Sequence, residues 1–224
     1  MSISPEDIES ATKEALEYSD KNPRKFVETI DVIVNLKNVN LKDPANRFNN
    51  EFELPNPVDP NPSICFFVEG DQLVEANKLG EDAMDVEQME QISKGEKSQR
   101  RNFVKKYDFF IASTQMMRHV AKNFGRLFGP RGKMPRPQPQ GYGVISPSDS
   151  VADSRERYKK IIRLRLTKFP LIQFKVGTKE MPLEVIMENT KAALDFIENK
   201  LDKGRQQLKS IYIKTTMGKP ARVL

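Results

Sequence analysis

Positive charge, glycine and proline are concentrated in residues 123–143, which read NFGRLFGPRGKMPRPQPQGYG. This stretch holds four cations, no acids, four of the chain's 15 prolines and five of its 11 glycines. Arginine can engage phosphate with two hydrogen bonds, and exposed backbone amides can also bind it. The composition predicts a phosphate-binding loop or, alternatively, a rigid loop that sets an interdomain angle. The candidate residues are Arg126, Gly129, Arg131, Gly132, Lys133, Met134 and Arg136.

Two phosphate-binding motifs of enzymes can be compared with the chain, and neither matches. The segment GPRGKM lacks the glycine that a phosphate loop needs five residues before Gly132, and Met134 replaces its Ser or Thr. The second motif is the glycine-rich dinucleotide-binding fingerprint. The segment EGD (69–71) does not match it, because it has one glycine and two acids that would repel a pyrophosphate. We expect no catalytic residues. A nucleotide- or phosphate-binding enzyme is the alternative.

Cysteine and histidine are too few for metal or redox chemistry. The chain has one of each, Cys65 and His119, so it can form neither an internal disulfide nor a Cys/His metal cluster. No apolar run approaches the roughly 20 residues that cross a bilayer, and MSISPEDIES is not a secretory signal. We expect a cytosolic protein without metal or cofactor.

Charge is distributed unevenly along the chain, whose total net charge is +6. Residues 1–62 carry a net −5, residues 63–151 a net +2 and residues 152–224 a net +9. This asymmetry indicates a polyanionic partner for the last third, or alternatively a solvated lysine-rich surface.

The two ends of the chain share one pattern. A helix is expected from Ser4-Pro5 to Asn22, and a second from Pro182 to Gly204. Apolar residues alternate in TIDVIVNL (29–36) and SIYIKTT (210–216), and LIQFKV (171–176) is a further candidate strand. These elements predict an antiparallel α+β structure.

The middle of the chain has a different pattern. ICFFV (64–68) and YDFFIAS (107–113) are continuous apolar runs, which is typical of strands buried on both faces. Helices are expected after Gly70, over residues 86–106 and after Thr114. PNPVDPNP (55–62) and SPSDS (146–150) read as linkers.

The predicted fold class is therefore mixed, α/β and α+β, with two domains. Residues 1–60 and 152–224 are expected to form an α+β domain, into which an α/β domain at 61–151 is inserted. Three small lobes in series are the alternative, but each outer piece has too few elements to bury a core alone.

Several segments together resemble the family of ribosomal protein L-one, in its archaeal branch. The signature GPRGKMPRPQP is accompanied, in the expected order, by RKFVETIDVIVNLK (24–37), LKDPANRF (41–48), YDFFIAS and TMGKP (216–220). The resemblance covers the whole chain. It implies a first domain built from both termini and a Rossmann-like insertion joined by two hinge strands.

The resemblance also implies a function without catalysis. Members of this family bind large-subunit ribosomal RNA in the mobile stalk beside the tRNA exit site, chiefly through the first domain. Many also repress translation by binding their own mRNA. The expected partners are large-subunit ribosomal RNA, exit-site tRNA and the chain's own mRNA. The protein is expected to be a monomer within the cytoplasmic ribosome and not to bind a membrane. An adaptor that binds proteins through PRPQP is a third hypothesis.

Site residues are carried over from the family onto matching positions. The implied RNA surface consists of Lys25, Phe26, Thr29, Ser210, Lys214, Thr216, Met217 and Gly218. Hydroxyls and a glycine backbone can reach ribose and phosphate, and flat apolar groups can lie against the minor groove or an exposed base. Where the family usually has Asp-Lys, this chain has Lys168-Phe169. Either an RNA contact is missing there or Lys168 contacts phosphate. The glycine- and proline-rich motif lies in the inserted domain, where it is expected to make secondary RNA contacts or to set the hinge.

Overall fold

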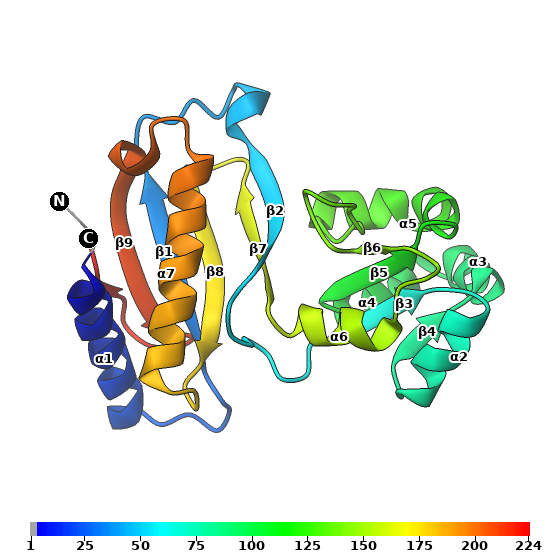
Figure 1. The fold of residues 1–224 in the computed structure, drawn as a ribbon, viewed down its shortest axis with the longest axis horizontal. Coiled ribbons are helices and arrows are strands. Elements are labelled where there is room, and N and C mark those ends of the chain that lie inside the picture. Colours follow the sequence, from blue (N-terminus) through cyan, green and yellow to red (C-terminus); the bar gives the residue numbers. More distant parts are fainter. Residues whose placement is uncertain (1–3) are drawn as a thin grey trace. The chain divides into compact units, whose positions relative to one another are not determined.

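The computed structural model of the protein describes residues 4–224, so the first three residues of the N-terminal stretch considered above lie outside the described part. The chain divides into two compact units, which are coloured along the sequence in Figure 1. The terminal unit comprises Met1–Pro60 and Lys160–Leu224, and the inserted unit comprises Asn61–Lys159. The chain therefore returns to the terminal unit at 159/160, eight residues after the predicted boundary at 151/152.

The terminal unit is built on a four-stranded antiparallel sheet in the order β10-β9-β1-β8. Its strands are β1 (Thr29–Leu36), β8 (Leu171–Thr178), β9 (Leu208–Thr215) and β10 (Ala221–Arg222). Ile30, Val32 and Val34 point into the core from β1, and the residues between them are half-buried on the opposite face. The alternation predicted for residues 29–36 is confirmed.

Two helices, α1 (Pro5–Lys21) and α7 (Leu183–Lys200), supply the apolar residues that cover the core face of this sheet. The Ser4 and Asp7 side chains cap the start of α1 reciprocally, which agrees with the predicted start. The helix α7 ends at Lys200, earlier than the expected stop at Gly204. Gly204 instead adopts φ +51° and begins a 3₁₀ turn, η2 (Gly204–Gln207).

A short 3₁₀ turn, η1 (Pro44–Asn46), leads into strand β2 (Phe48–Glu53). This strand pairs with β7 (Ile161–Leu166) in a two-stranded antiparallel ribbon. Phe48 pairs with Leu166 and Glu53 with Ile161, and the Leu54 N–H donates to the Lys160 carbonyl at 2.9 Å. The outgoing and returning chain are thus held together where the inserted unit begins and ends. This pairing allows an insertion of about a hundred residues without disrupting the terminal core.

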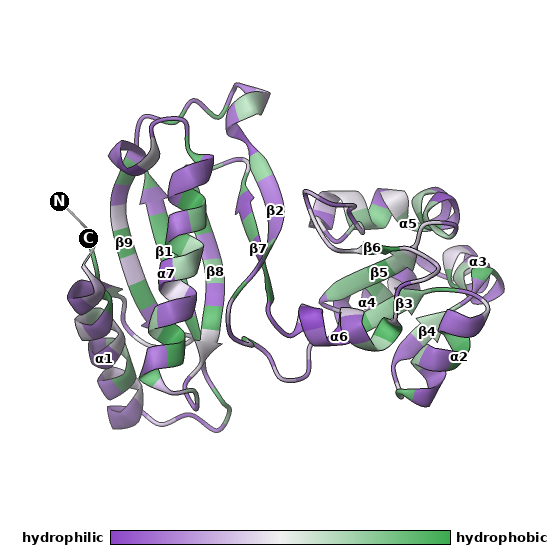
Figure 2. Cartoon of the chain, viewed as in Figure 1, coloured by the Kyte–Doolittle hydropathy of each residue, from purple (hydrophilic) through white to green (hydrophobic). Residues whose placement is uncertain are grey.

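The inserted unit has a parallel sheet in the order β4-β3-β5-β6. Its strands are β4 (Asp82–Met84), β3 (Ile64–Phe67), β5 (Phe109–Ser113) and β6 (Val144–Ile145). Every residue of β3 and β5 is buried, as the continuous apolar runs predicted, and Figure 2 shows these central strands largely in hydrophobic colours. The expected α/β class is confirmed for this unit.

Three helices contribute to one aromatic core with Phe67 and Phe110: α3 (Val86–Lys94), α4 (Lys97–Lys106) and α5 (Met117–Arg131). The single helix expected over residues 86–106 is two helices, because Gly95 ends α3 and Glu96 caps α4. Side chains of β5 alternate between the two faces of the sheet. Phe109 therefore packs on the face opposite this aromatic core, with its ring 4.9 Å from that of Tyr158.

The remaining helices of the inserted unit are α2 (Asp71–Lys78) and α6 (Val151–Tyr158). Ser150 caps α6 and donates a hydrogen bond to the Glu75 carboxylate of α2 at 2.7 Å, and Arg155 forms an ion pair with Glu81. Residues 146–150, predicted as a linker, form a turn within the inserted unit that ends at Ser150, the cap of α6. These contacts explain why the boundary lies after α6.

Candidate nucleic-acid interface

The start of β1 and the end of β9 lie side by side, although their residues are far apart in the sequence. The Thr29 N–H donates to Thr216 Oγ1 at 3.1 Å, the Thr216 N–H donates to the Thr29 carbonyl at 3.0 Å, and the two hydroxyl oxygens are 2.9 Å apart. We call this surface the β1–β9 end and define it by Lys25, Phe26, Thr29, Thr216, Met217 and Gly218. The structure brings six of the predicted RNA-binding residues together.

Two large apolar side chains of the β1–β9 end are exposed. Phe26 is 53% and Met217 56% accessible, so neither side chain belongs to the core. Val27 beside them is 50% accessible, and Lys25 is exposed. Exposed apolar groups beside hydroxyls and a cation can meet both the bases or sugars and the phosphates of RNA.

A buried carboxylate supports this end from beneath. Glu28 is only 2% accessible, and its oxygens accept hydrogen bonds from the Ser19 hydroxyl and, at 2.8 Å, from the Met217 N–H. Burial raises the pKa of Glu28, but these hydrogen bonds and the Lys179 charge outweigh it, so the pKa is lowered overall. The carboxylate is therefore ionised and fixes the backbone of Met217.

Sequence reasoning missed Glu28. Its only signal was an acid between the exposed Phe26-Val27 pair and the strand that begins at Thr29, and a surface carboxylate gives the same pattern. Its role depends on Ser19, Met217 and Lys179, which come from three other parts of the chain.

Gly218 has a steric role in the same turn. A Cβ atom on Gly218 would lie 2.3 Å from Thr215 Oγ1, which is buried within the end of β9. The Gly218 N–H donates to the Thr215 carbonyl at 3.0 Å. The tight turn after β9 requires glycine here because a side chain would push Met217 away from its place.

Lys214 lies next to the β1–β9 end, on the face of the sheet opposite the core. Its Nζ donates to the Thr216 carbonyl at 3.2 Å, and its cross-strand partner on β1 is Asp31. Burial raises the pKa of Asp31, although Lys214 and Lys175 oppose this shift. Lys175 in turn contacts the Asp59 carboxylate at 2.9 Å. This sheet face is half-exposed and carries both signs of charge.

The other two predicted residues of the terminal unit lie at the far end of the sheet. Asn35 pairs with Ser210 and Leu171, whereas Thr29 pairs with Thr178, six residues away along β1. That separation is about 20 Å at the usual rise of a strand. Ser210 is 9% accessible and accepts a hydrogen bond from the Asn35 amide at 2.9 Å, so it is mainly structural.

Lys168 is exposed in the turn that joins β7 to β8, at this far end. Its neighbour Phe169 is 72% accessible, the highest value among the exposed large apolar residues. The turn is tight, since the Leu171 N–H donates to the Phe169 carbonyl at 2.7 Å. The turn thus presents a cation and an aromatic ring where the family usually has an acid and a lysine.

The proline- and glycine-rich motif of the inserted unit is only partly a loop, which corrects the interpretation from composition. The helix α5 continues through Gly129 and Pro130 to Arg131, and Gly132 ends it with φ +68°. Lys133 does not present a free charge, because its Nζ donates to the carbonyls of Val104 and Tyr107.

The remaining residues of the motif also divide into two kinds. Met134 packs against the aromatic core, and Gly132 is buried. Arg126 and Gly129 are exposed, whereas Arg131 and Arg136 are half-buried. The centre of the motif therefore anchors the end of α5 to the strand β5 region, and its exposed cation lies on the helix.

Residues 4–224 contain no group of three or more His, Cys, Asp or Glu side chains that could hold a metal ion. Within the same residues, no helix is long and apolar enough to span a bilayer.

The sequence matches a family whose members are structural ribosomal proteins and not enzymes. Residues 15–219 match the model of the Ribosomal protein L1p/L10e family, and the chain belongs to this family. The expected resemblance and the expected absence of catalysis are thereby confirmed.

Archaeal relatives match over nearly their whole length and are each described as large ribosomal subunit protein uL1. The protein from Thermococcus kodakarensis is 38% identical, covering 100% of this chain and 99% of the relative. That from Pyrococcus horikoshii is 37% identical, covering 100% and 98%, and that from Methanothermobacter thermautotrophicus is 36% identical, covering 98% and 99%. The expected resemblance to the archaeal branch is confirmed.

Proposed function

We propose that this protein is a structural component of the large ribosomal subunit in the cytoplasm, where it binds ribosomal RNA through its terminal unit. The observation that carries this proposal is the β1–β9 end, where exposed Phe26 and Met217 flank the Thr29–Thr216 hydrogen bonds. Family membership and the names of the archaeal relatives support the ribosomal setting.

The chemistry of this end favours recognition of RNA shape. The two threonine hydroxyls, the Gly218 backbone, the Phe26 ring and the Met217 thioether offer short-range contacts to ribose and bases. Lys25 and Lys214 supply charge for phosphates. Because Glu28 and Gly218 hold the backbone in place, little conformational entropy is lost on binding.

The finer role proposed here is in the stalk beside the tRNA exit site. There the terminal unit would hold the ribosomal RNA, and the inserted unit would support the stalk and contact exit-site tRNA. Since one surface can bind two RNAs of similar shape, the same β1–β9 end would bind the protein's own mRNA and repress its translation.

The test is a binding titration of the purified full chain with the stalk segment of its own large ribosomal RNA. A scrambled hairpin of equal length is the control, and salt is varied. We expect tight binding that survives moderate salt, with the scramble much weaker. Equal binding to both RNAs, falling steeply with salt, would show only a basic surface and would contradict the proposal.

Repression is tested separately by competition. A leader segment of the protein's own mRNA should displace the stalk segment from the chain. Met217→Ala should lower the affinity for both RNAs by the same factor. An mRNA leader that binds without displacing the stalk segment would contradict a shared surface.

A further inference from the structure

The inserted unit separates its charges sharply, which its small net charge conceals. Residues 63–96 carry two basic and nine acidic side chains. Residues 97–148 carry eleven basic side chains and a single acid, Asp108. The helices α4 and α5 lie entirely within this second segment and contain no acid at all.

Six of these cations form two rows. On α4, Lys97, Arg101 and Lys105 recur every four residues and are all exposed. On α5, the same spacing recurs in another exposed set, Arg118, Lys122 and Arg126. Residues four apart share one side of a helix and are separated by about 6 Å along its axis. We call these two sets the cation rows.

The cation rows have no carboxylate partners within ion-pair distance in the described part of the chain. The described pairs of the inserted unit use other cations: Lys94, Lys106, Arg155 and Lys159. Lys122 helps to lower the pKa of Glu90, but Glu90 is already paired with Lys94 at 3.1 Å. The positive charge of the rows is thus largely uncompensated.

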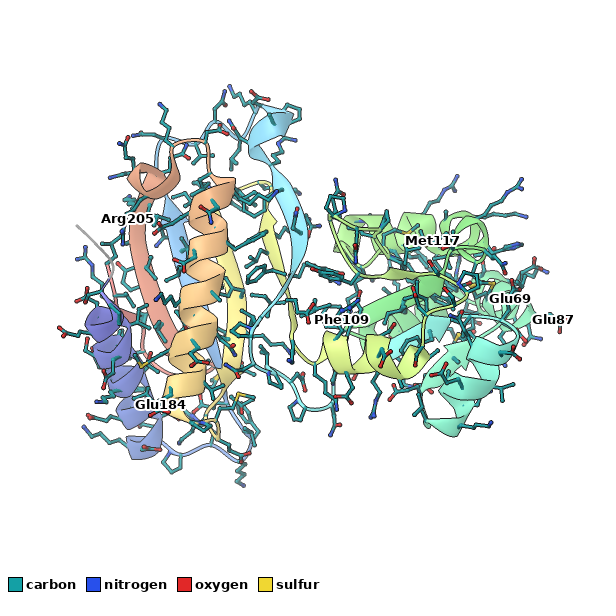
Figure 3. The ribbon with its side chains drawn as sticks, in the orientation of Figure 1. Glu69, Glu87, Phe109, Met117, Glu184 and Arg205 are labelled. Carbon is teal, nitrogen blue, oxygen red and sulfur yellow. The ribbon has the colours of Figure 1, made fainter. Side chains whose placement is uncertain are left out.

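The rows stand on a rigid base. The helices α4 and α5 share the aromatic core, with the Phe103 and Phe124 rings 5.5 Å apart, and the Lys133 side chain ties the end of α5 to the Val104 carbonyl of α4. Figure 3 labels Met117 at the start of α5, and nitrogen-tipped side chains extend outward from this helix. The cations are therefore held by helices and not by a flexible tail.

The chemistry around the rows selects the kind of partner. None of the exposed large apolar residues of the described chain, such as Val74 or Leu79, lies on α4 or α5. A protein interface needs apolar anchors at its centre, and a membrane-surface helix needs an apolar face toward the lipid. A phosphate backbone needs neither, because cations alone supply sequence-independent affinity.

We propose that the cation rows of α4 and α5 form a second RNA-binding surface, which contacts the phosphate backbone of duplex RNA without reading its sequence. Of the six residues, only Arg126 was among those predicted from the glycine- and proline-rich motif. The proposal extends the proposed function, since it assigns to the inserted unit an electrostatic role separate from the shape recognition of the β1–β9 end.

The experiment compares salt dependence of binding among three full-chain variants and the wild type. The row variants are K97Q/R101Q/K105Q and R118Q/K122Q/R126Q, and the control K78Q/K94Q/K159Q removes the same charge elsewhere in the inserted unit. The probe is a duplex RNA of about 16 base pairs with no relation to the stalk sequence. Each lost phosphate contact should reduce the slope of log K against log salt by about 1.

We expect each row variant to reduce the slope by about 2 to 3, with the control variant within about 1 of the wild type. Melting temperatures should be nearly unchanged in the row variants, because the replaced side chains are exposed. The control should also change little, since the half-buried Lys159 makes only a local pair with the exposed Glu156. Equal slopes for the row and control variants would overturn the proposal. Competition by polyglutamate of equal charge that is as strong as competition by the duplex would also overturn the proposal, because the rows would then bind any polyanion.

The two proposals fail in different ways. Loss of the row cations should leave the preference for the stalk RNA over its scramble intact, because that preference is assigned to the β1–β9 end. If the row variants abolish the preference, the division of roles proposed here is wrong. If the wild type shows no preference at all, the proposed function fails, while the slope still tests the rows.

Discussion

The β1–β9 end and the cation rows are both exposed surfaces proposed to bind RNA, yet they are built in opposite ways. The β1–β9 end gathers residues from two distant strands, and a buried carboxylate, Glu28, holds their backbone. The cation rows need only the local repeat of a helix, on two helices that share an aromatic core. Short-range recognition of shape requires fixed positions, whereas long-range attraction to phosphate requires only charge at the surface.

Net charge does not reveal this difference. The terminal unit carries 21 basic and 18 acidic side chains and the inserted unit carries 16 and 13, so each has a net charge of +3. Residues 160–224 carry a net +8, which the net −5 of residues 1–60 offsets once both ends fold into one unit. The arrangement of charges, and not their total, separates the two surfaces.

The largest expected effect is on the support beneath the β1–β9 end. Glu28→Leu should lower the free energy of unfolding by about 3 kcal/mol, because the Ser19 hydroxyl and the Met217 N–H would lose a buried charged acceptor. Chemical denaturation monitored by circular dichroism measures it. The matched control is Glu14→Leu on the exposed side of α1, expected within about 0.5 kcal/mol of wild type. Equal stability of both variants would mean that Glu28 does not support this end.

The same carboxylate predicts a pH dependence. The pKa of Glu28 is lower in the folded chain than its ordinary value of 4.5, so its contribution to stability is fully present above that value and is lost as pH falls through the folded pKa. The difference in unfolding free energy between wild type and Glu28→Gln should therefore shrink below about pH 4.5. A difference that stays constant down to pH 3 would contradict the assignment.

A smaller effect on stability is expected in the inserted unit. Lys133→Met should cost about 2 kcal/mol, since the Val104 and Tyr107 carbonyls lose a charged donor. The salt slope for duplex RNA should stay the same, because this lysine is not in the cation rows. Lys78→Met at an exposed position of α2 is the control. An unchanged stability together with a reduced slope would show that Lys133 contacts RNA and does not support the fold.

Met217→Ala tests the β1–β9 end without disturbing it. We expect stalk-RNA affinity to fall about tenfold, equivalent to about 1.4 kcal/mol, with little change in melting temperature because the side chain is exposed. Val74→Ala, equally exposed in the inserted unit, should have no effect on binding. Thr216→Val is a poorer probe, because its hydroxyl also bonds to Thr29. Unchanged affinity of Met217→Ala would place the RNA elsewhere.

The smallest effect is expected at the far end of the sheet. Lys168→Gln should reduce the salt slope for the stalk RNA by about 1 and the affinity by less than about 1 kcal/mol, as for a single phosphate contact. Lys200→Gln at the end of α7 is the control. If Lys168→Gln matches this control, the turn that differs from the family pattern makes no RNA contact.

Local patterns predicted the elements well because each depends on neighbouring residues. The alternation in 29–36 and the apolar runs of β3 and β5 were sufficient, since burial on one face or both leaves a direct trace in the sequence. Breaks were harder to predict. Gly95 divides residues 86–106 into two helices, and α5 continues through Gly129-Pro130, because tertiary packing decides whether a glycine or proline interrupts a helix.

Residue patterns were enough to identify the family, the two kinds of fold within one chain and the six residues that define the β1–β9 end. Which of the predicted site residues meet depends on tertiary contacts, which join Thr29 to Thr216, place Ser210 about 20 Å away and turn Lys133 inward. It also set the return boundary after α6. The physical reason is that hydrogen bonds and burial depend on distances between residues far apart in the chain, which spacing along the sequence does not encode.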